Sequence, residues 1–231
     1  MKQSDLALLV FGGVVVLLLA AVFSGVFAPK EAIAEQTGEV ALTIPQTSGA
    51  APESSATSEN ATTGELEMTE IAVLETTKGN IEIELNRAKA PITVANFVTY
   101  VNEGFYNGTI FHRVMDGFMV QGGGFTPDGN EKDTHATIKL ESNNGLHNGV
   151  GTIAMARTNA PNSATSQFFI NVADNAFLDY SSGNAGYAVF GKVISGMDTV
   201  NKIKAVETTS KLGNDDWPIE DVIITGAYMK K

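Results

Sequence analysis

From residue 70 onward the chain consists mainly of short runs rich in β-branched and aromatic residues, separated by turn residues. Within residues 70–85, two predicted strands flank a Lys78-Gly79-Asn80 turn, and every second residue of the later strand is apolar. Further strands are predicted at residues 109–115, 118–122, 151–157, 167–173, 187–194 and 220–229. Eight or so short strands with glycine turns favour an antiparallel barrel or sandwich over a layered βαβ fold.

Two segments of this region have helical character. Pro91 is suited to open a helix, and the segment PITVANFVTYVNEG that it begins has apolar residues at helical spacing: Val94, Phe97, Val98 and Val101. Residues 197–206, MDTVNKIKAV, predict a second short helix. Residues 70–231 are therefore expected to form one mainly β domain.

The N-terminal region has a different character. Residues 6–28 include no charged side chain, and as a helix they would span roughly 34 Å, enough to cross a ~30 Å hydrocarbon core. This length favours an uncleaved signal anchor over residues 1–28. The alternative is a signal peptide, because Ala32-Ile33-Ala34 has the form of a cleavage site and removal after Ala34 would release the rest. Either possibility places the remainder on the extracytoplasmic side, which in a bacterium is the periplasmic side.

Residues 29–69 connect this segment to the β region. They are rich in Ala, Ser, Thr, Glu, Gly and Pro and include no aromatic residue. A segment of this composition buries too little apolar surface to offset the entropy of ordering it. The sequence predicts a disordered tether.

Composition excludes several functions. The 231-residue chain has a formal net charge of −11, which disfavours a nucleic-acid groove lined by lysine and arginine. It has no cysteine, and its three histidines lie far apart in the sequence. We therefore expect neither a metal site nor a cofactor.

Four motifs, read in order, carry a family resemblance. They are FHRVMDGFMVQGGGFT from Phe111, MART from Met155 with a downstream SQFFI, AFLDY from Ala176, and YAVFGKV from Tyr187. In this order and spacing they resemble the cyclophilin family of peptidyl-prolyl cis-trans isomerases, over about residues 70–229, and most closely its short periplasmic-type bacterial members. The resemblance implies a closed eight-stranded antiparallel β-barrel capped by two helices, with a substrate groove on its outer face.

The resemblance also implies the site residues. Arg113 corresponds to the catalytic arginine of the family. The proline pocket corresponds to Phe118, Met119, Phe169 and Leu178, and the neighbouring substrate-binding residues are His112, Gln121, Ala156, Arg157, Gln167, Phe177 and Tyr187. Many eukaryotic members have tryptophan at the position of Phe177 and histidine at that of Tyr187, and Arg157 replaces a common asparagine.

An arginine suits the chemistry that the resemblance implies. Rotation about an X–Pro bond localises a lone pair on the prolyl nitrogen, and a guanidinium, always protonated and planar, can donate a hydrogen bond to it. The amide of Gln121 on the adjacent strand could hold this guanidinium. Glycines 122–124 could let a peptide backbone approach the rim of the groove.

The predicted function is therefore isomerisation of X–Pro bonds in peptides and proteins, assisting the folding of exported proteins. The partners would be proline-containing polypeptides and, through the N-terminal helix, a membrane, with the domain acting as a monomer. The main alternative is a non-catalytic peptide-binding or chaperone module that uses the same groove. A lipocalin-like carrier is disfavoured because large side chains should fill a small barrel. A serine hydrolase is disfavoured because the chain has no GxSxG motif.

Overall fold

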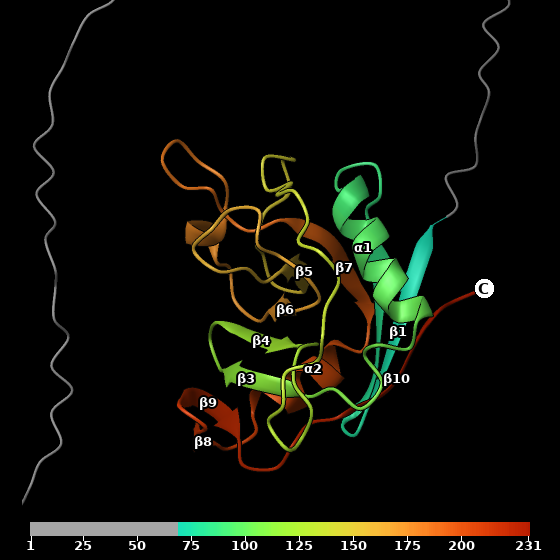
Figure 1. The fold of residues 1–231 in the computed structure, drawn as a ribbon, viewed down its shortest axis with the longest axis vertical. Helices are drawn as coiled ribbons and strands as arrows, with labels where there is room; N and C mark the ends of the chain where they lie inside the picture. Colours follow the sequence, from blue (N-terminus) through green and yellow to red (C-terminus); the bar gives the residue numbers. More distant parts are fainter. Residues whose placement is uncertain (1–68) are drawn as a thin grey trace, which may run out of the picture. The chain divides into compact units, whose positions relative to one another are not determined.

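The structure is a computed structural model that describes residues 69–231 (Figure 1). The predicted anchor at residues 1–28 lies outside the described residues, as does all of the predicted tether except Thr69. None of the helices between residues 69 and 231 is long and apolar enough to cross a membrane.

Residues 69–231 form ten strands, two α-helices and one short 3₁₀ helix. The strands are β1 (Glu70–Thr76), β2 (Gly79–Leu85), β3 (Phe111–Met115), β4 (Met119–Gly122), β5 (Thr152–Met155), β6 (Phe168–Asn171), β7 (Val189–Ser195), β8 (Thr208–Lys211), β9 (Asn214–Pro218) and β10 (Ile224–Met229). The helices are α1 (Pro91–Asn102), α2 (Met197–Lys204) and the 3₁₀ helix η1 (Ala176–Leu178). The eight predicted strands and two predicted helices are thus all present.

Eight of the strands form one antiparallel sheet in the order β10-β1-β2-β7-β5-β6-β4-β3. The register shifts within several of the pairs, including β3–β4 near His112 and β5–β7 near Ala154. Irregularities of this kind increase local twist and let a sheet curl around a core.

The curled sheet does not close through a continuous ladder. Its two outer strands, β3 and β10, meet only where they begin, through a bridge between Ile110 and Ile223. Backbone hydrogen bonds from Phe111 N–H to the Val222 carbonyl (2.9 Å) and from Ile224 N–H to the Thr109 carbonyl (2.7 Å) accompany this bridge. The structure therefore differs from the expected fully closed barrel, because the other residues of β3 and β10 diverge after this contact.

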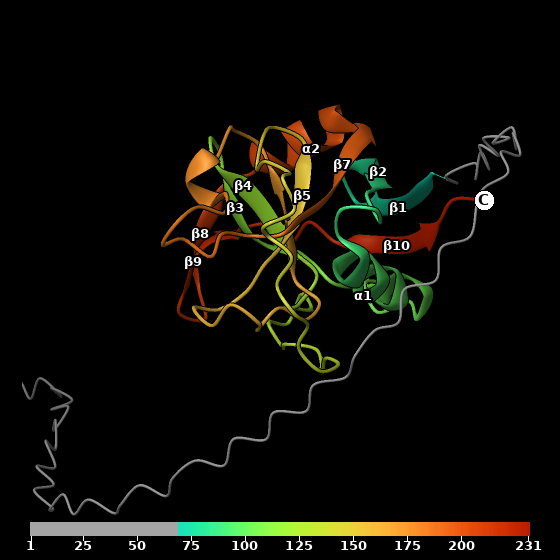
Figure 2. The ribbon, with the colours of Figure 1, turned by 90° about the horizontal axis from the view of Figure 1, so that it is seen from above.

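The two helices lie on opposite sides of the curled sheet (Figure 2). Helix α1 buries Val94, Phe97 and Val101, and the Phe97 ring lies 5.7 Å from that of Phe168 and 5.1 Å from that of Phe190. Helix α2 buries Val200 and Ile203 and contacts β2, β3 and β4. These contacts fill the inside of the sheet, so the free outer face is the surface on which a site can form.

A second, two-stranded sheet formed by β8 and β9 was not predicted. It lies beside β3 in both views (Figures 1 and 2). Trp217 of β9 is fully buried, with its ring 6.0 Å from that of His112 and 5.8 Å from that of Phe125. The only tryptophan of the chain thus attaches this hairpin to the strand that carries Arg113.

Candidate active site

A groove of about 620 Å³ on the outer face of the sheet brings together nearly all of the predicted site residues. The predicted residues that line it are His112, Arg113, Phe118, Met119, Gln121, Ala156, Arg157, Gln167, Phe169, Leu178 and Tyr187. Phe177 is the exception. It stands at the rim, 66% exposed, with its ring stacked on that of Phe118 at 5.6 Å.

The floor of the groove is an apolar pocket. Met119 and Phe169 are almost fully buried there and form one cluster with Ala154 and Val189. Around this floor stand the partly exposed side chains of Phe118, Ala156, Leu178 and Tyr187. The four residues predicted as the proline pocket therefore lie together, and they form a surface that can take a small apolar ring.

Strand alternation and one bulge place the site residues on this face. Phe168 faces the inner core and Phe169 faces the groove, as neighbouring residues of a strand should. His112 and Arg113 are also neighbours, yet both line the groove. The register shift between Phe111 and Arg113 explains this, because a bulge redirects one side chain.

Arg113 is half-exposed beside the pocket. Its Nη2 donates to the sulfur of Met115 at 3.2 Å, and its Nε lies 3.9 Å from Oδ2 of Asp216. Its Cζ lies 6.0 Å from the centre of the Phe118 ring. None of these contacts is a strong hydrogen bond, so much of the donor capacity of the guanidinium is available to a bound peptide.

The second arginine of the groove is engaged differently. Arg157 donates from Nε to the Gly186 carbonyl (2.9 Å) and from Nη1 to the Thr158 carbonyl (2.8 Å). Its Cζ stands 4.4 Å above the centre of the Tyr187 ring, a cation–π distance. Arg157 therefore forms a wall of the groove, whereas Arg113 is the guanidinium with free donors.

Gln121 lies opposite Arg113 in the sheet but does not hold its guanidinium. Its Nε2 donates to Oε1 of Gln167 at 2.9 Å, and Gln167 in turn donates to Glu131 at 3.2 Å. Gln121 was expected to hold the guanidinium of Arg113. Its observed hydrogen bonds instead order one side of the groove.

The glycines after Gln121 make room for side chains. A Cβ at Gly124 would lie 2.6 Å from Cγ of Gln167, and one at Gly123 would lie 2.9 Å from the ring of Phe168. Gly123 also has a φ of +81°, which side chains rarely adopt. The absence of side chains at these glycines therefore allows Phe168 and Gln167 to pack closely against the backbone. The close approach of a peptide expected from the sequence stays a prediction.

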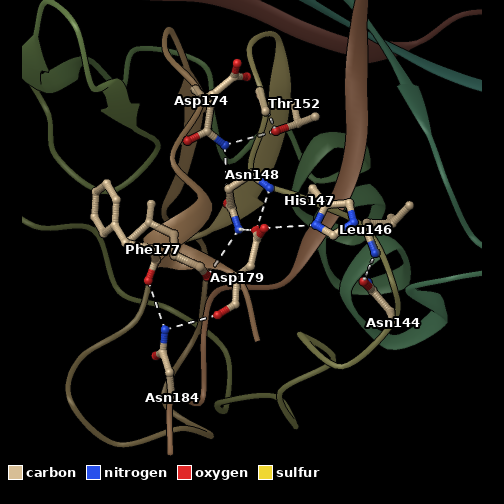
Figure 3. A network of polar contacts seen from close by, with 12 residues as sticks. Asn144, Leu146, His147, Asn148, Thr152, Asp174, Phe177, Asp179 and Asn184 are labelled. Atoms are coloured by element: carbon tan, nitrogen blue, oxygen red, sulfur yellow. Dashed lines mark hydrogen bonds and ion pairs between the residues drawn. The ribbon is translucent and has the colours of Figure 1, made fainter. Parts of the chain in front are cut away.

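A polar network holds the rim segment that follows the pocket (Figure 3). The Asp179 carboxylate accepts from the backbone N–H of Asn148 (2.7 Å), and the Asn148 side chain donates to the Leu178 carbonyl (3.2 Å). Asn184 donates to the Phe177 carbonyl at 2.9 Å. Burial would raise the pKa of Asp179, but hydrogen bonds from Asn148 and His147 outweigh it and lower that pKa. An ionised Asp179 thus fixes the segment that carries Phe177 and Leu178.

The other wall of the pocket is tied to this network. Asn175 donates from its side chain to the Phe118 carbonyl at 2.9 Å and to the Asn171 side chain at 2.7 Å. Asn171 donates onward to Asn148 at 3.3 Å. Because all three asparagines are buried, these hydrogen bonds join two sides of the pocket into one rigid unit.

His112 is held in the neutral form beside Arg113. Its ring is almost fully buried, 4.6 Å from that of Phe125, and its Nδ1 has no hydrogen-bond partner among the described residues. Burial, and next the positive charge of Arg113, lower the pKa of His112 to about 4. The resemblance implies that His112 binds substrate; its burial against Phe125 and Trp217 gives it a structural part as well, at the edge of the groove.

This low pKa predicts a pH-dependent stability. Unfolded His112 would titrate near its ordinary pKa of 6.5, so the unfolded state takes up a proton first as the pH falls. The contribution of His112 should therefore lower the free energy of unfolding by about 2 kcal/mol between pH 7 and pH 5. Urea unfolding at both pH values would measure the loss. The variant His112→Phe should show a loss smaller by that amount, and an equal loss in both proteins would contradict the prediction.

The β8–β9 hairpin adds a wall that sequence reasoning missed. Phe125 and residues 213–216 also line the groove, and two of them, Asp215 and Asp216, are acidic. The hairpin segment, TTSKLGNDDWP (residues 208–218), has no alternating apolar pattern, so its sequence did not predict a strand pair. The only signal was the isolated Trp217.

A larger hollow of about 1060 Å³ includes residues of β2 and β7 but none of the predicted site residues. The charged side chains that line it pair with one another. Arg87 donates to Glu70 at 2.8 Å, and Lys192 lies 2.9 Å from Glu84. With these charges already neutralised, the groove at Arg113 is the better candidate for a site.

The groove places an arginine with free donors beside a rigid apolar pocket, on the outer face of a curled antiparallel sheet. This arrangement suits a domain that binds peptides containing proline. The family model described as cyclophilin type peptidyl-prolyl cis-trans isomerase/CLD matches residues 71–229. The chain belongs to this cyclophilin family.

Named relatives and solved structures agree with this assignment. The chain is 55% identical over 159 residues to peptidyl-prolyl cis-trans isomerase A of Dickeya dadantii, covering 69% of this chain and 84% of that protein. It is 57% identical over 152 residues to peptidyl-prolyl cis-trans isomerase B of Escherichia coli, covering 64% and 93%. A crystal structure of a Cryptosporidium parvum cyclophilin type isomerase, determined in the presence of the dipeptide Ala-Pro, matches with a TM-score of 0.58 and 27% identity, covering 70% and 99%.

Proposed function

We propose that Arg113 and the apolar pocket beside it form the catalytic centre of a peptidyl-prolyl cis-trans isomerase. Isomerase activity is the function that family membership and the named relatives support. The observation that carries the assignment of the centre is the difference between the two arginines of the groove. Arg113 has free donors beside the pocket, whereas Arg157 donates hydrogen bonds to two backbone carbonyls.

The mechanism requires only differential binding. A planar X–Pro bond is separated from its isomer by about 18–20 kcal/mol, because lone-pair resonance gives the C–N bond partial double-bond character. The pocket formed by Met119, Phe169 and their neighbours would hold the proline ring. A donor from Arg113 would then meet the lone pair that appears on the prolyl nitrogen only in the twisted state. A ten-thousandfold acceleration corresponds to roughly 5.5 kcal/mol of such differential stabilisation.

The experiment that tests this proposal is magnetisation exchange between the cis and trans signals of a short Ala-Pro peptide. Residues 69–231, purified alone, should produce exchange at substoichiometric amounts, because every groove residue lies within this range. Without the protein the same signals exchange only over tens to hundreds of seconds. A folded domain that binds the peptide without accelerating exchange would favour the non-catalytic peptide-binding or chaperone alternative.

We further propose that the isomerase acts as an exported monomer, anchored by residues 6–28, on unfolded proline-containing proteins outside the cytoplasm. The support is the length of the uncharged N-terminal segment and the fact that one chain supplies the whole groove. In a bacterial host, the domain should be degraded by protease added to spheroplasts and should sediment with membranes. Protection from protease would contradict export, and a soluble product beginning after Ala34 would show cleavage instead of anchoring.

A further inference from the structure

The β8–β9 hairpin brings a carboxylate to the side chain that the proposed function makes catalytic. Asp216 Oδ2 lies 3.9 Å from Nε of Arg113, and no other carboxylate among residues 69–231 forms an ion pair with this guanidinium. Gln121, which faces Arg113 across the sheet, is engaged with Gln167 instead. Among the described residues, Asp216 is therefore the carboxylate within ion-pair distance of Arg113.

The position of Asp216 is set by its neighbour in the sequence. Trp217 is fully buried against the rings of His112 and Phe125. Because His112 directly precedes Arg113 and Trp217 directly follows Asp216, the packing of the two rings places the carboxylate beside the guanidinium. Lys211 secures the other strand of the hairpin, since its Nζ donates to the Pro127 carbonyl at 3.2 Å.

The backbone of Asp216 narrows the choice of side chain. Its φ is 60°, in the left-handed region where asparagine and aspartate are strongly enriched among residues with a side chain. Asparagine would therefore fit the same backbone and the same volume without the charge. This makes Asp216→Asn a variant that isolates the electrostatic part of the contact.

Two contacts, both weaker than a strong hydrogen bond, bear on the plane of the Arg113 guanidinium. Nε faces Asp216 and Nη2 donates to Met115 at 3.2 Å, whereas Nη1 has no partner among the described residues. Since the five N–H donors of arginine are coplanar, orienting two of its nitrogens also orients the third. We propose that Asp216 is a positioning residue that holds the Arg113 guanidinium so that its remaining donors are presented to the substrate. This inference rests on the proposed function of Arg113.

The contact is longer than a hydrogen bond and half-exposed, so it acts through charge and should be screened by salt. In the full-length chain, Asp216→Asn should lower kcat by about three- to tenfold and change peptide affinity by less than about twofold. Raising the salt concentration to about 0.5 M should lower the wild-type kcat toward that of the variant and leave the variant unchanged.

A matched control separates this effect from a general loss of negative charge. Asp198→Asn removes an exposed carboxylate that pairs with Lys202 at 3.7 Å on α2, outside the groove. It should leave kcat and its salt dependence unchanged. The NMR signal of the Arg113 Nε–H group should shift in Asp216→Asn and stay in place in Asp198→Asn.

Two results would overturn the proposal. One is a wild-type kcat together with an unshifted Arg113 Nε–H signal in Asp216→Asn. The other is a loss confined to peptides with lysine or arginine beside the proline, which would mean that Asp216 recognises the substrate charge. If the wild-type chain itself failed to isomerise peptides, the proposed function would fall, and the Nε–H signal would still decide whether Asp216 orients the guanidinium.

Discussion

Replacement of Arg113 by alanine is expected to lower the isomerisation rate by roughly two to three orders of magnitude, with a much smaller change in peptide affinity. The hydrogen bond from Arg113 is made to a lone pair that exists only in the twisted state, so its loss removes transition-state stabilisation and little ground-state binding. About 3–4 kcal/mol would be lost, which is typical of removing one aimed donor. Folding should survive, because the side chain is half-exposed in the groove and outside the core.

Two further variants define what this result means. Arg113→Lys keeps the charge but loses the planar set of donors, and it should remain strongly impaired. Phe169→Ala removes part of the pocket floor and should weaken peptide affinity as well as the rate. Affinity by titration and rate by exchange spectroscopy, measured on the same folded proteins, separate these effects. An Arg113→Ala protein that isomerises at nearly the wild-type rate would exclude the mechanism and favour the peptide-binding alternative.

The elements with a strong periodic pattern could be predicted from the sequence. In β2, Ile81, Ile83 and Leu85 alternate and are buried, and in α1 the apolar residues at helical spacing face the core. In β6, the family resemblance placed Phe169 in the groove, where the structure has it, and strand alternation turns its neighbour Phe168 into the core. These predictions succeeded because side-chain direction follows directly from the period of a strand or a helix.

The features that the sequence did not predict correctly depend on contacts between segments that are distant in the chain. The expected closed barrel requires β3 and β10 to pair along their length, and no local pattern shows that they meet only at Ile110 and Ile223. The bulge at His112 is equally invisible in the sequence, although it explains how two neighbouring residues share one face. Gln121 was expected to hold the guanidinium of Arg113, but its side chain donates instead to Gln167, which directly precedes the neighbouring strand β6.

The β8–β9 hairpin was missed because its two strands are short and polar and have no alternating apolar pattern. Its turn contains Gly213, with a φ of 78°, but Leu212 before it and Asp216 within β9 also adopt positive φ values, 55° and 60°, although neither is glycine. Such a hairpin has little intrinsic stability, since a two-stranded ribbon is marginal in water. The anchor that Trp217 provides to the main sheet must therefore supply most of what holds it in place.

Replacement of Trp217 by alanine should accordingly lower the free energy of unfolding by about 3–5 kcal/mol, the usual range for removing a large buried aromatic side chain. The ring is fully buried between segments that are far apart in the sequence, so the cavity left behind would be hard to close. Urea unfolding would measure the loss. The control Ile219→Ala, two residues later and 60% exposed, should change stability by less than about 1 kcal/mol.

The same variant separates the two roles of the hairpin. If Trp217 only fills space, Trp217→Ala should isomerise peptides at the wild-type rate when the rate is expressed per folded molecule. If it also carries Asp216 to Arg113, the folded fraction should show the reduced kcat expected for Asp216→Asn and should lose the salt dependence of the wild-type chain. A stability change below about 1 kcal/mol would contradict the view that this side chain attaches the hairpin to the sheet.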